Sequence, residues 1–397
     1  MSEGSQIIKG HYQGQRGPLF GLAFVTALLT MLTLGIYRFW GKTRIRRYIW
    51  SSVSGDGDSF EYTGTGLEKF LGFLVAIVLL AVYLGAVQMI LFFFGLTLFA
   101  EPTSPEMALA QMGGFYLTFL AVVPLIFFAQ YRARRYKLAR SRWRGVRFGA
   151  EKGAWGYALR AMGHWLLTIL TLGLMLPRQT FWLEKYKTDR SWYGDGRFVQ
   201  EGRWSALYGA MKHLFIGVGL VLAAVVALAL QSPVVGGVLA AVGYVWAMVG
   251  FISYRVRAFI YLTEHKVLDD GIRFEARPET RTIIGLVIVG SLVVSLIMGV
   301  VFAVLAALAS MVVGPAMMAP GPGHIVGLVL MMGLYLGALL MGGALSLVWI
   351  VQPVIAHVVG AITVRGADRL ADIRQRVHDS GADAEGFADA LDVGGAI

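Results

Sequence analysis

Arginine clusters interleaved with aromatic residues are the first feature of the sequence that could do chemistry. They occur in the stretches "RIRRYIW", "RARRYKL" and "RVRAFIY". A guanidinium group binds phosphate through a planar fork of N–H donors, so such clusters beside a membrane fit anionic lipid head groups. The alternative is that they only fix the membrane topology. The arginines concerned are Arg44, Arg46, Arg47, Arg132, Arg134, Arg135, Arg255 and Arg257.

Residues that usually carry catalysis or bind metals form no recognisable set. The chain has no cysteine, and no two of its 7 histidines lie three or four positions apart. Residues 269–285 superficially resemble the Asp-Gly…Ala-Arg motif of CDP-alcohol phosphotransferases. Their spacing differs, however, and the carboxylates of a two-metal site are missing. We therefore expect a protein that is not an enzyme and has no cofactor or metal.

Polar side chains at membrane depth are few. Gln88 and Gln352 either line a path or bridge helices, and no acidic residue falls within the expected spans. Intramembrane carboxylates usually accompany proton coupling, so their absence argues against a proton-driven transporter. Small residues recur every fourth position from Ser291 to Ala307, which indicates close helix packing. The expected function is lipid interaction or partner binding; the alternative is a passive transporter or channel for a small solute.

The elements that must position these residues are membrane helices. Apolar residues make up 57% of the chain and charged residues 15%. Several stretches exceed the roughly 18 apolar residues that indicate a transmembrane helix. Residues 1–18 contain no long apolar stretch, so we expect no removable signal peptide. The expected fold is an all-α polytopic membrane protein with three transmembrane hairpins. The six spans lie near residues 70–99, 115–131, 213–230, 234–253, 283–313 and 325–357.

Two further apolar segments, 19–40 and 155–177, are ambiguous. If both crossed the membrane, one strongly basic segment would lie outside, against the positive-inside tendency. If both enter and leave on one face, every basic segment is cytoplasmic, and links such as 231–233 that lack Lys and Arg are external. We therefore expect two re-entrant or interfacial segments, although two short spans remain the alternative. Residues 1–365 then form one membrane domain and 366–397 a cytoplasmic tail, with both termini cytoplasmic.

The net charge of +11 fits cytoplasmic loops beside anionic lipid better than nucleic acid, so the expected partners are the phospholipid membrane and its anionic head groups. The boundary Leu-Thr-Leu-Gly occurs twice, at residues 32–35 and 170–173, and we expect Gly35 and Gly173 to be helix ends or sharp bends. Basic-aromatic runs are followed by a glycine-containing turn and a short strand four times. The expected cytoplasmic strands are 59–62, 146–149, 197–200 and 272–276.

Together, "LLTMLTLGIYRFWGKTRIRRYIW", "FEYTGTGLEKFLG", "GVRF" and "ADALDVGGAI" resemble the YjgN-like family of bacterial inner-membrane proteins. The resemblance extends over nearly the whole chain, and its first block is the most specific. It implies a polytopic protein of the inner membrane. It supplies no catalytic residue, and the second Leu-Thr-Leu-Gly boundary departs from the family pattern.

Overall fold

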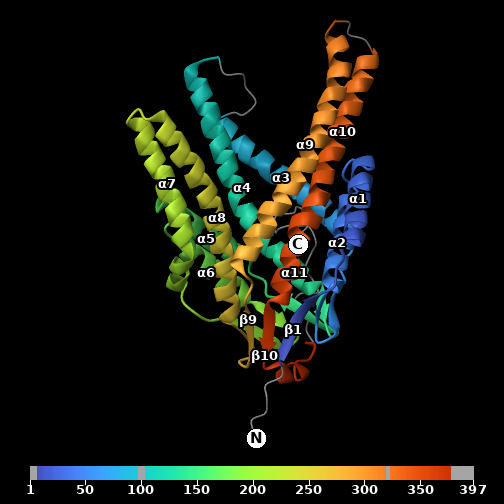
Figure 1. The fold of residues 1–397 in the computed structure, drawn as a ribbon, viewed down its shortest axis with the longest axis vertical. Coiled ribbons are helices and arrows are strands. Elements are labelled where there is room, and N and C mark those ends of the chain that lie inside the picture. The colour runs from blue at the N-terminus through green and yellow to red at the C-terminus, as the bar shows by residue number, and fades with distance from the viewer. Residues whose placement is uncertain (1–6, 97–102, 319–321, 377–397) are drawn as a thin grey trace. The chain divides into compact units, whose positions relative to one another are not determined.

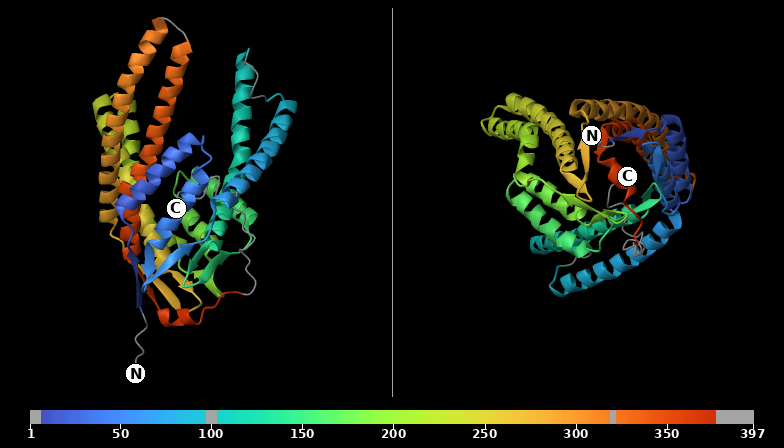
Figure 2. Two further views of the ribbon diagram at one scale, coloured as in Figure 1. Left: turned by 90° about the vertical axis from the view of Figure 1, so that its right-hand side faces the viewer. Right: turned by 90° about the horizontal axis from the view of Figure 1, so that it is seen from below.

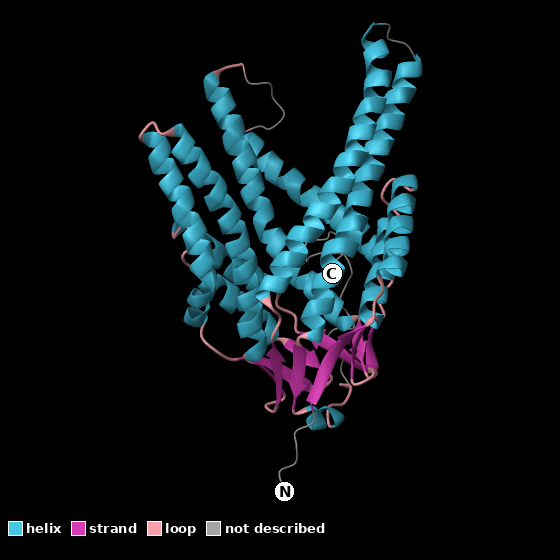
Figure 3. Ribbon diagram, viewed as in Figure 1, coloured by secondary structure: helices cyan, strands magenta, loops and turns pink. Residues whose placement is uncertain are grey.

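The computed structural model describes residues 7–96, 103–318 and 322–376. The described residues form two compact units. The first comprises parts of Met1–Tyr62, Ala206–Lys266 and Gly271–Leu370, and the second comprises parts of Thr63–Ser205, Val267–Asp270 and Ala371–Ile397. Each unit combines helices with short antiparallel strands, several of which begin directly after a helix (Figure 3).

The first unit contains four of the six longest helices among the described residues. Its helices are α1 (Arg16–Leu32), α2 (Arg38–Ser51), α7 (Lys212–Ala229), α8 (Pro233–Glu264), α9 (Thr280–Met318), α10 (Pro322–Ser346) and α11 (Gln352–Gly360). One π-helical turn, Leu347–Val351, joins α10 to α11, and a 3₁₀ turn, Ala367–Ala371, begins at the end of the unit. The pair α7 and α8 and the pair α9 and α10 each pack along their length (Figures 1 and 2).

The sheet of the first unit joins strands from distant parts of the chain. Its strands are β1 (Ile7–Tyr12), β2 (Val53–Gly55), β3 (Asp58–Tyr62), β9 (Ile272–Ala276) and β10 (Ile362–Arg365). The order is β9-β10-β1-β2-β3 with antiparallel pairing, and Ile8 lies opposite Val364. In Figure 1 the labelled strands β9, β10 and β1 lie side by side.

The second unit has the same kinds of element. Its helices are α3 (Gly66–Phe93), α4 (Pro105–Ala139), α5 (Ala154–Leu170) and α6 (Leu176–Thr188), and a 3₁₀ turn, Trp204–Met211, begins in it. Its strands are β4 (Ser141–Trp143), β5 (Val146–Ala150), β6 (Ser191–Tyr193), β7 (Gly196–Gln200) and most of β8 (Lys266–Leu268), in that order. A buried cluster that includes Phe127, Tyr157 and Leu183 packs α4, α5 and α6 together.

Six helices of the described chain are long and apolar enough to cross a membrane. They are Gly66–Phe93, Pro105–Ala139, Trp204–Ala229, Pro233–Glu264, Thr280–Met311 and Ile325–Gly360. Each predicted span overlaps one of them, which confirms a helical polytopic architecture; residues 97–99 of the first predicted span lie outside the described residues. The helices α4 and α8 continue beyond the predicted ends at 131 and 253. In both helices the basic and aromatic residues that follow the apolar part remain helical.

The Leu-Thr-Leu-Gly repeat forms one helix-ending turn twice. Leu34 and Leu172 are left-handed, with φ of 50° and 49°, and the glycines that follow have φ of 96° and 89°. The peptide N–H of Gly35 donates to Thr30 O, and that of Gly173 donates to Thr168 O, both at 2.7 Å. These are the bonds of a Schellman motif, which satisfies carbonyl groups left open at a helix end. The two ambiguous segments are therefore not straight helices.

The two turns belong to a longer repeat. The helices α1 and α5 are each 17 residues long, and each is followed by the turn, a second helix and a strand pair. Contacts between α1 and α2, and between α5 and α6, show that the chain folds back on itself after each turn. The predicted segments 19–40 and 155–177 end just past the turns, whereas the returning limbs continue to Ser51 and Thr188.

Two expectations from the sequence need correction. All four expected strands are present, as β3, β5, β7 and β9. The all-α class is nevertheless too narrow, because each of them pairs with shorter strands that the sequence analysis did not predict. Within the described residues, the small-residue stripe from Ser291 to Ala307 is not the face through which α9 meets α10. A Cβ atom on Gly299 would meet nothing within 4 Å, and α9 instead meets α10 through larger residues such as Met298 and Leu305.

Candidate functional site

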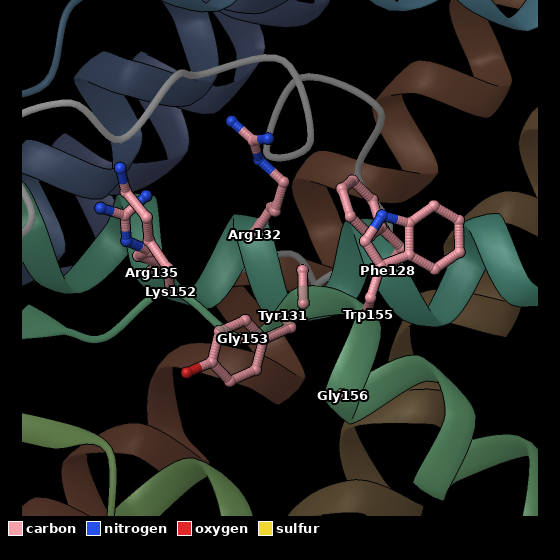
Figure 4. A pocket seen from close by; sticks show the side chains of 9 residues that line it. Phe128, Tyr131, Arg132, Arg135, Lys152, Gly153, Trp155 and Gly156 are labelled. Atoms are coloured by element: carbon pink, nitrogen blue, oxygen red, sulfur yellow. The ribbon is translucent and has the colours of Figure 1, made fainter.

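The second unit contains a cavity of about 560 Å³ beside α4, here called the basic cavity (Figure 4). One wall is the face of α4 that carries Phe128, Tyr131, Arg132 and Arg135, and the other is the loop from β5 into α5. Helical residues three and four positions apart share a face, which brings these side chains together. The loop contributes Lys152, Gly153, Ala154, Trp155 and Gly156.

Three cations meet at the basic cavity. Arg135 is buried, and its Nε donates to the carbonyl of Ala150 at 3.1 Å. Arg132 lies over the ring of Phe128, 5.7 Å from its centre, and Lys152 is exposed on the loop. In Figure 4 the guanidinium groups of Arg132 and Arg135 point to the same side of α4. None of the nine lining residues is acidic, so the lining itself contributes three positive charges and no negative one.

Aromatic residues form the wall at the start of α5. Trp155 is 56% exposed, and its ring centre lies 4.8 Å from that of Phe128. A largely exposed tryptophan beside arginine at the end of an apolar helix is typical of a membrane interface, where the ring is amphipathic. The cavity therefore combines a polar, cationic part with an aromatic edge suited to lipid.

Glycines allow a tyrosine to support the loop from behind. Tyr186 of α6 donates its hydroxyl to the carbonyl of Gly153 at 2.8 Å. A Cβ atom on Gly156 would lie 2.5 Å from that hydroxyl oxygen, so only glycine leaves room for it. Tyr186 also packs against Tyr157, and burial, followed by the nearby Glu184 carboxylate, raises the pKa of Tyr157 to about 12. The Tyr157 phenol is therefore neutral and does not repel an anion.

The predicted arginines are not gathered at one site. Arg132 and Arg135 line the basic cavity. Arg134 is instead 3.7 Å from the Glu184 carboxylate, and Arg46 is buried, with its Nη1 donating to the Tyr62 hydroxyl at 3.2 Å. Arg44 donates to the hydroxyl of Tyr37 at 3.0 Å. The remaining predicted arginines are exposed on α2 and α8; they are Arg47, Arg255 and Arg257.

The sequence did not single out the lysine that completes the basic cavity. Lys152 precedes α5 by two residues and stands outside any cluster. Only the fold of the loop against α4 brings it beside Arg132. In the sequence, Lys152 could be recognised only by comparing the residues that follow each of the predicted strands.

The two glutamines that the sequence analysis expects at membrane depth make interhelical or loop contacts. Gln88 donates to Thr118 at 2.8 Å and so joins α3 to α4. Gln352 is buried, and its Nε2 donates to the carbonyl of Gly14 at 3.1 Å. Neither residue lines the basic cavity. Among the residues that the structure describes, no three His, Asp or Glu side chains are grouped as metal ligands would be.

Comparison with known proteins assigns the chain to a family. The profile of the family described as "Bacterial protein of unknown function (DUF898)" matches residues 8–390. The chain belongs to this family. Similar curated members include inner membrane protein YjgN of Salmonella typhimurium, 27% identical over 149 residues, and of Escherichia coli K12, 30% identical over 148 residues.

The similarity to these relatives is partial. The aligned regions cover 37% and 36% of this chain and 33% and 32% of the relatives, so the match spans about a third of their length. No solved structure matches the chain. The family resemblance expected from the sequence is confirmed, and the described fold applies to the DUF898 region itself.

Proposed function

We propose that this DUF898 protein is a multi-pass protein of the bacterial inner membrane that binds an anionic phospholipid head group in the basic cavity, without chemical turnover. The observation that carries the proposal is the convergence of Arg132, Arg135 and Lys152 beside Phe128 and Trp155, with no acidic residue in the lining. A cavity of about 560 Å³ is within the usual range for small-molecule sites.

The chemistry of the three cations favours a phosphate diester. Hydrogen bonds to charged groups contribute about 1.5–3 kcal/mol each. Arg135 is positioned by its bond to Ala150, so its ordering cost is met before the ligand binds. Lys152 provides a mobile point charge, and Trp155 provides an apolar surface for the glycerol and upper acyl chains. Such pockets at the cytoplasmic side of helices are typical of anionic lipid binding.

The proposed topology places the strands and both termini in the cytoplasm, with three transmembrane hairpins. The hairpins α1–α2 and α5–α6 would insert only their tips. At 1.5 Å per residue, α1 is about 25 Å long, short of a hydrocarbon core of about 30 Å. The tip residues Leu34 and Leu172 are 92% and 93% exposed. Because α2 carries five Lys and Arg residues, complete insertion would cost several kcal/mol per charge.

Cysteine labelling tests this topology. Single cysteines at Ser104, Ser232 and Ser51 can be introduced into a chain that has none. Ser104 and Ser232 precede α4 and α8, whereas Ser51 ends α2. A membrane-impermeant maleimide should label the first two in intact spheroplasts and Ser51→Cys only after lysis. Labelling of Ser51→Cys from outside would show that the orientation is wrong.

Native mass spectrometry of the purified protein tests lipid binding. The protein is titrated with phosphatidylglycerol, phosphatidylcholine or inorganic phosphate. The double variant Arg132→Gln/Lys152→Gln should weaken phosphatidylglycerol retention tenfold or more, since two charge-assisted contacts are lost. The matched control is Arg255→Gln/Arg257→Gln, which removes two exposed charges from α8.

The control should retain phosphatidylglycerol as the wild type does. Equal weakening in both double variants would mean that binding depends only on net charge. Equal retention of phosphatidylcholine by the wild type would exclude a site selective for anions. Binding of inorganic phosphate at the same concentration as the lipid would assign the cavity to a soluble anion instead.

A further inference from the structure

A second cavity lies in the same unit, at the position where the repeat places the equivalent of the basic cavity. It has a volume of about 470 Å³ and lies beside α6 and the segment after β7. It is called the tryptophan cavity here. Its lining includes Phe181, Trp182, Lys185, Gln200, Glu201, Gly202, Arg203, Trp204 and Ser205.

The two cavities correspond residue by residue along their helices. Tyr131, Arg132 and Arg135 of α4 have counterparts fifty positions later in Phe181, Trp182 and Lys185 of α6. The strands correspond with the same spacing, because β5 is Val146–Ala150 and β7 is Gly196–Gln200.

The hydrogen bonds that shape the two cavities correspond as well. The Nε of Arg135 donates to Ala150 O, and the Nζ of Lys185 donates to Gln200 O at 2.6 Å. At the start of the strand pair, Ser141 and Ser191 each donate to the carbonyl four residues before, at 2.7 and 2.8 Å. The same local fold therefore builds both cavities.

The charges of the two cavities differ. In the tryptophan cavity Lys185 is neutralised by Asp189, whose carboxylate lies 2.9 Å from its Nζ. The position of Arg132 is taken by Trp182, which is 42% exposed. The segment after β7 contributes one acidic and one basic side chain, Glu201 and Arg203, both exposed. With Lys185 paired to Asp189, the lining of the tryptophan cavity has one negative and one positive side chain left, whereas the lining of the basic cavity has three cationic residues and no acidic one.

We propose that the tryptophan cavity binds the head group of a zwitterionic aminophospholipid of the phosphatidylethanolamine type. Glu201 would accept hydrogen bonds from the primary ammonium, and Arg203 would bind the phosphate. The indole rings of Trp182 and Trp204 offer π faces to the ammonium. Trp204 also begins the apolar segment Trp204–Ala229, which is long and apolar enough to cross a membrane, so the proposed membrane location puts this cavity near a lipid interface. This inference rests on the proposed membrane location but not on anion binding in the basic cavity.

The primary ammonium distinguishes this ligand from phosphatidylcholine. An ammonium with three N–H donors can bond to a carboxylate, whereas a trimethylated ammonium cannot. Phosphatidylethanolamine and phosphatidylcholine have the same net charge, so a preference between them measures this contact and not electrostatics in general.

Native mass spectrometry with both lipids tests the assignment. The wild type should retain phosphatidylethanolamine at least fivefold better than phosphatidylcholine, and Glu201→Gln should abolish this preference. The matched control is Glu151→Gln, at the corresponding position fifty residues earlier but outside the lining of either cavity. It should keep the preference. Equal melting temperatures of the two variants would show that both are folded.

Several outcomes would overturn the proposal. They are absence of a preference in the wild type, a preference that survives Glu201→Gln, and equal loss in the Glu151→Gln control. Displacement of the lipid by an equal concentration of free phosphoethanolamine would show that the ligand is not a lipid. Failure here is separate from failure at the basic cavity, because phosphatidylglycerol retention measures the latter and should be unchanged in Glu201→Gln. If Glu201→Gln does not fold, Glu201→Ala provides the same comparison, since it also removes the carboxylate.

Discussion

The turn after α5 can be tested by adding one methyl group at two glycines. Gly173 has φ of 89°, whereas Gly163 lies within the helix α5, and a Cβ atom on either would meet nothing within 4 Å. Steric crowding is therefore the same, and only the backbone conformation differs. An L-residue in a left-handed conformation costs about 1–2 kcal/mol. Alanine in place of glycine within a helix instead stabilises by about 0.5–1 kcal/mol.

We expect Gly173→Ala to lower the free energy of unfolding by about 1–2 kcal/mol and Gly163→Ala to raise it by about 0.5–1 kcal/mol. The measurement is unfolding in SDS–detergent mixtures, followed by the fluorescence of the 10 tryptophans. The pair Gly35→Ala and Gly21→Ala repeats the comparison in α1, with φ of 96° at Gly35. Shifts of the same sign at Gly163 and Gly173 would refute the helix-ending turn.

Two further predictions concern contacts within the units. Glu68 accepts from Tyr136 at 2.8 Å and pairs with Arg140 at 3.2 Å, so Glu68→Gln should lower the free energy of unfolding by about 1 kcal/mol in a denaturation curve; no change would mean that solvent replaces these contacts fully. Gly290→Ala should destabilise the protein by about 1–3 kcal/mol, because the added Cβ atom would lie 2.5 Å from the backbone oxygen of Trp349. Gly299→Ala, at an open position within α9, should instead stabilise by about 0.5–1 kcal/mol. Equal losses at both glycines would show that the face of Gly299 is covered.

The electrostatics of the pair formed by Glu68 and Arg140 give a further expectation. Burial lowers the pKa of Arg140, but the Glu68 carboxylate and its hydrogen bond outweigh this effect and raise the pKa above its usual value. The guanidinium is therefore charged at every pH at which the protein is handled. Loss of stability in Glu68→Gln should consequently be independent of pH between about 6 and 9, since arginine does not titrate there.

The long elements could be predicted from sequence because their signals are local. Apolar runs located the six helices that are long and apolar enough to cross a membrane, and Leu-Thr-Leu-Gly marked two helix ends at Gly35 and Gly173. The five-residue strand β9 was predicted with its observed bounds. In each case the chain pattern itself carries the physical cause, namely hydrophobic length, a positive φ or the residues that follow a tight turn.

The remaining features depend on contacts between distant residues. The three-residue strand β6 is too short to show an alternating pattern, and its pairing with β5 is visible only in the fold. The small residues around Gly299 suggested close packing, yet which face of α9 meets α10 is decided by the fit of both helices. Lys152 likewise becomes part of the basic cavity only because its loop folds against α4.

The most direct test of lipid binding is an experimental density map of the protein reconstituted with phosphatidylglycerol. We expect a phosphate between the guanidinium of Arg132 and the ammonium of Lys152, with the glycerol backbone against Trp155. In the Arg132→Gln/Lys152→Gln variant this density should disappear while lipid elsewhere is retained. Well-ordered lipid around the helices together with an unoccupied basic cavity in the wild type would contradict the account.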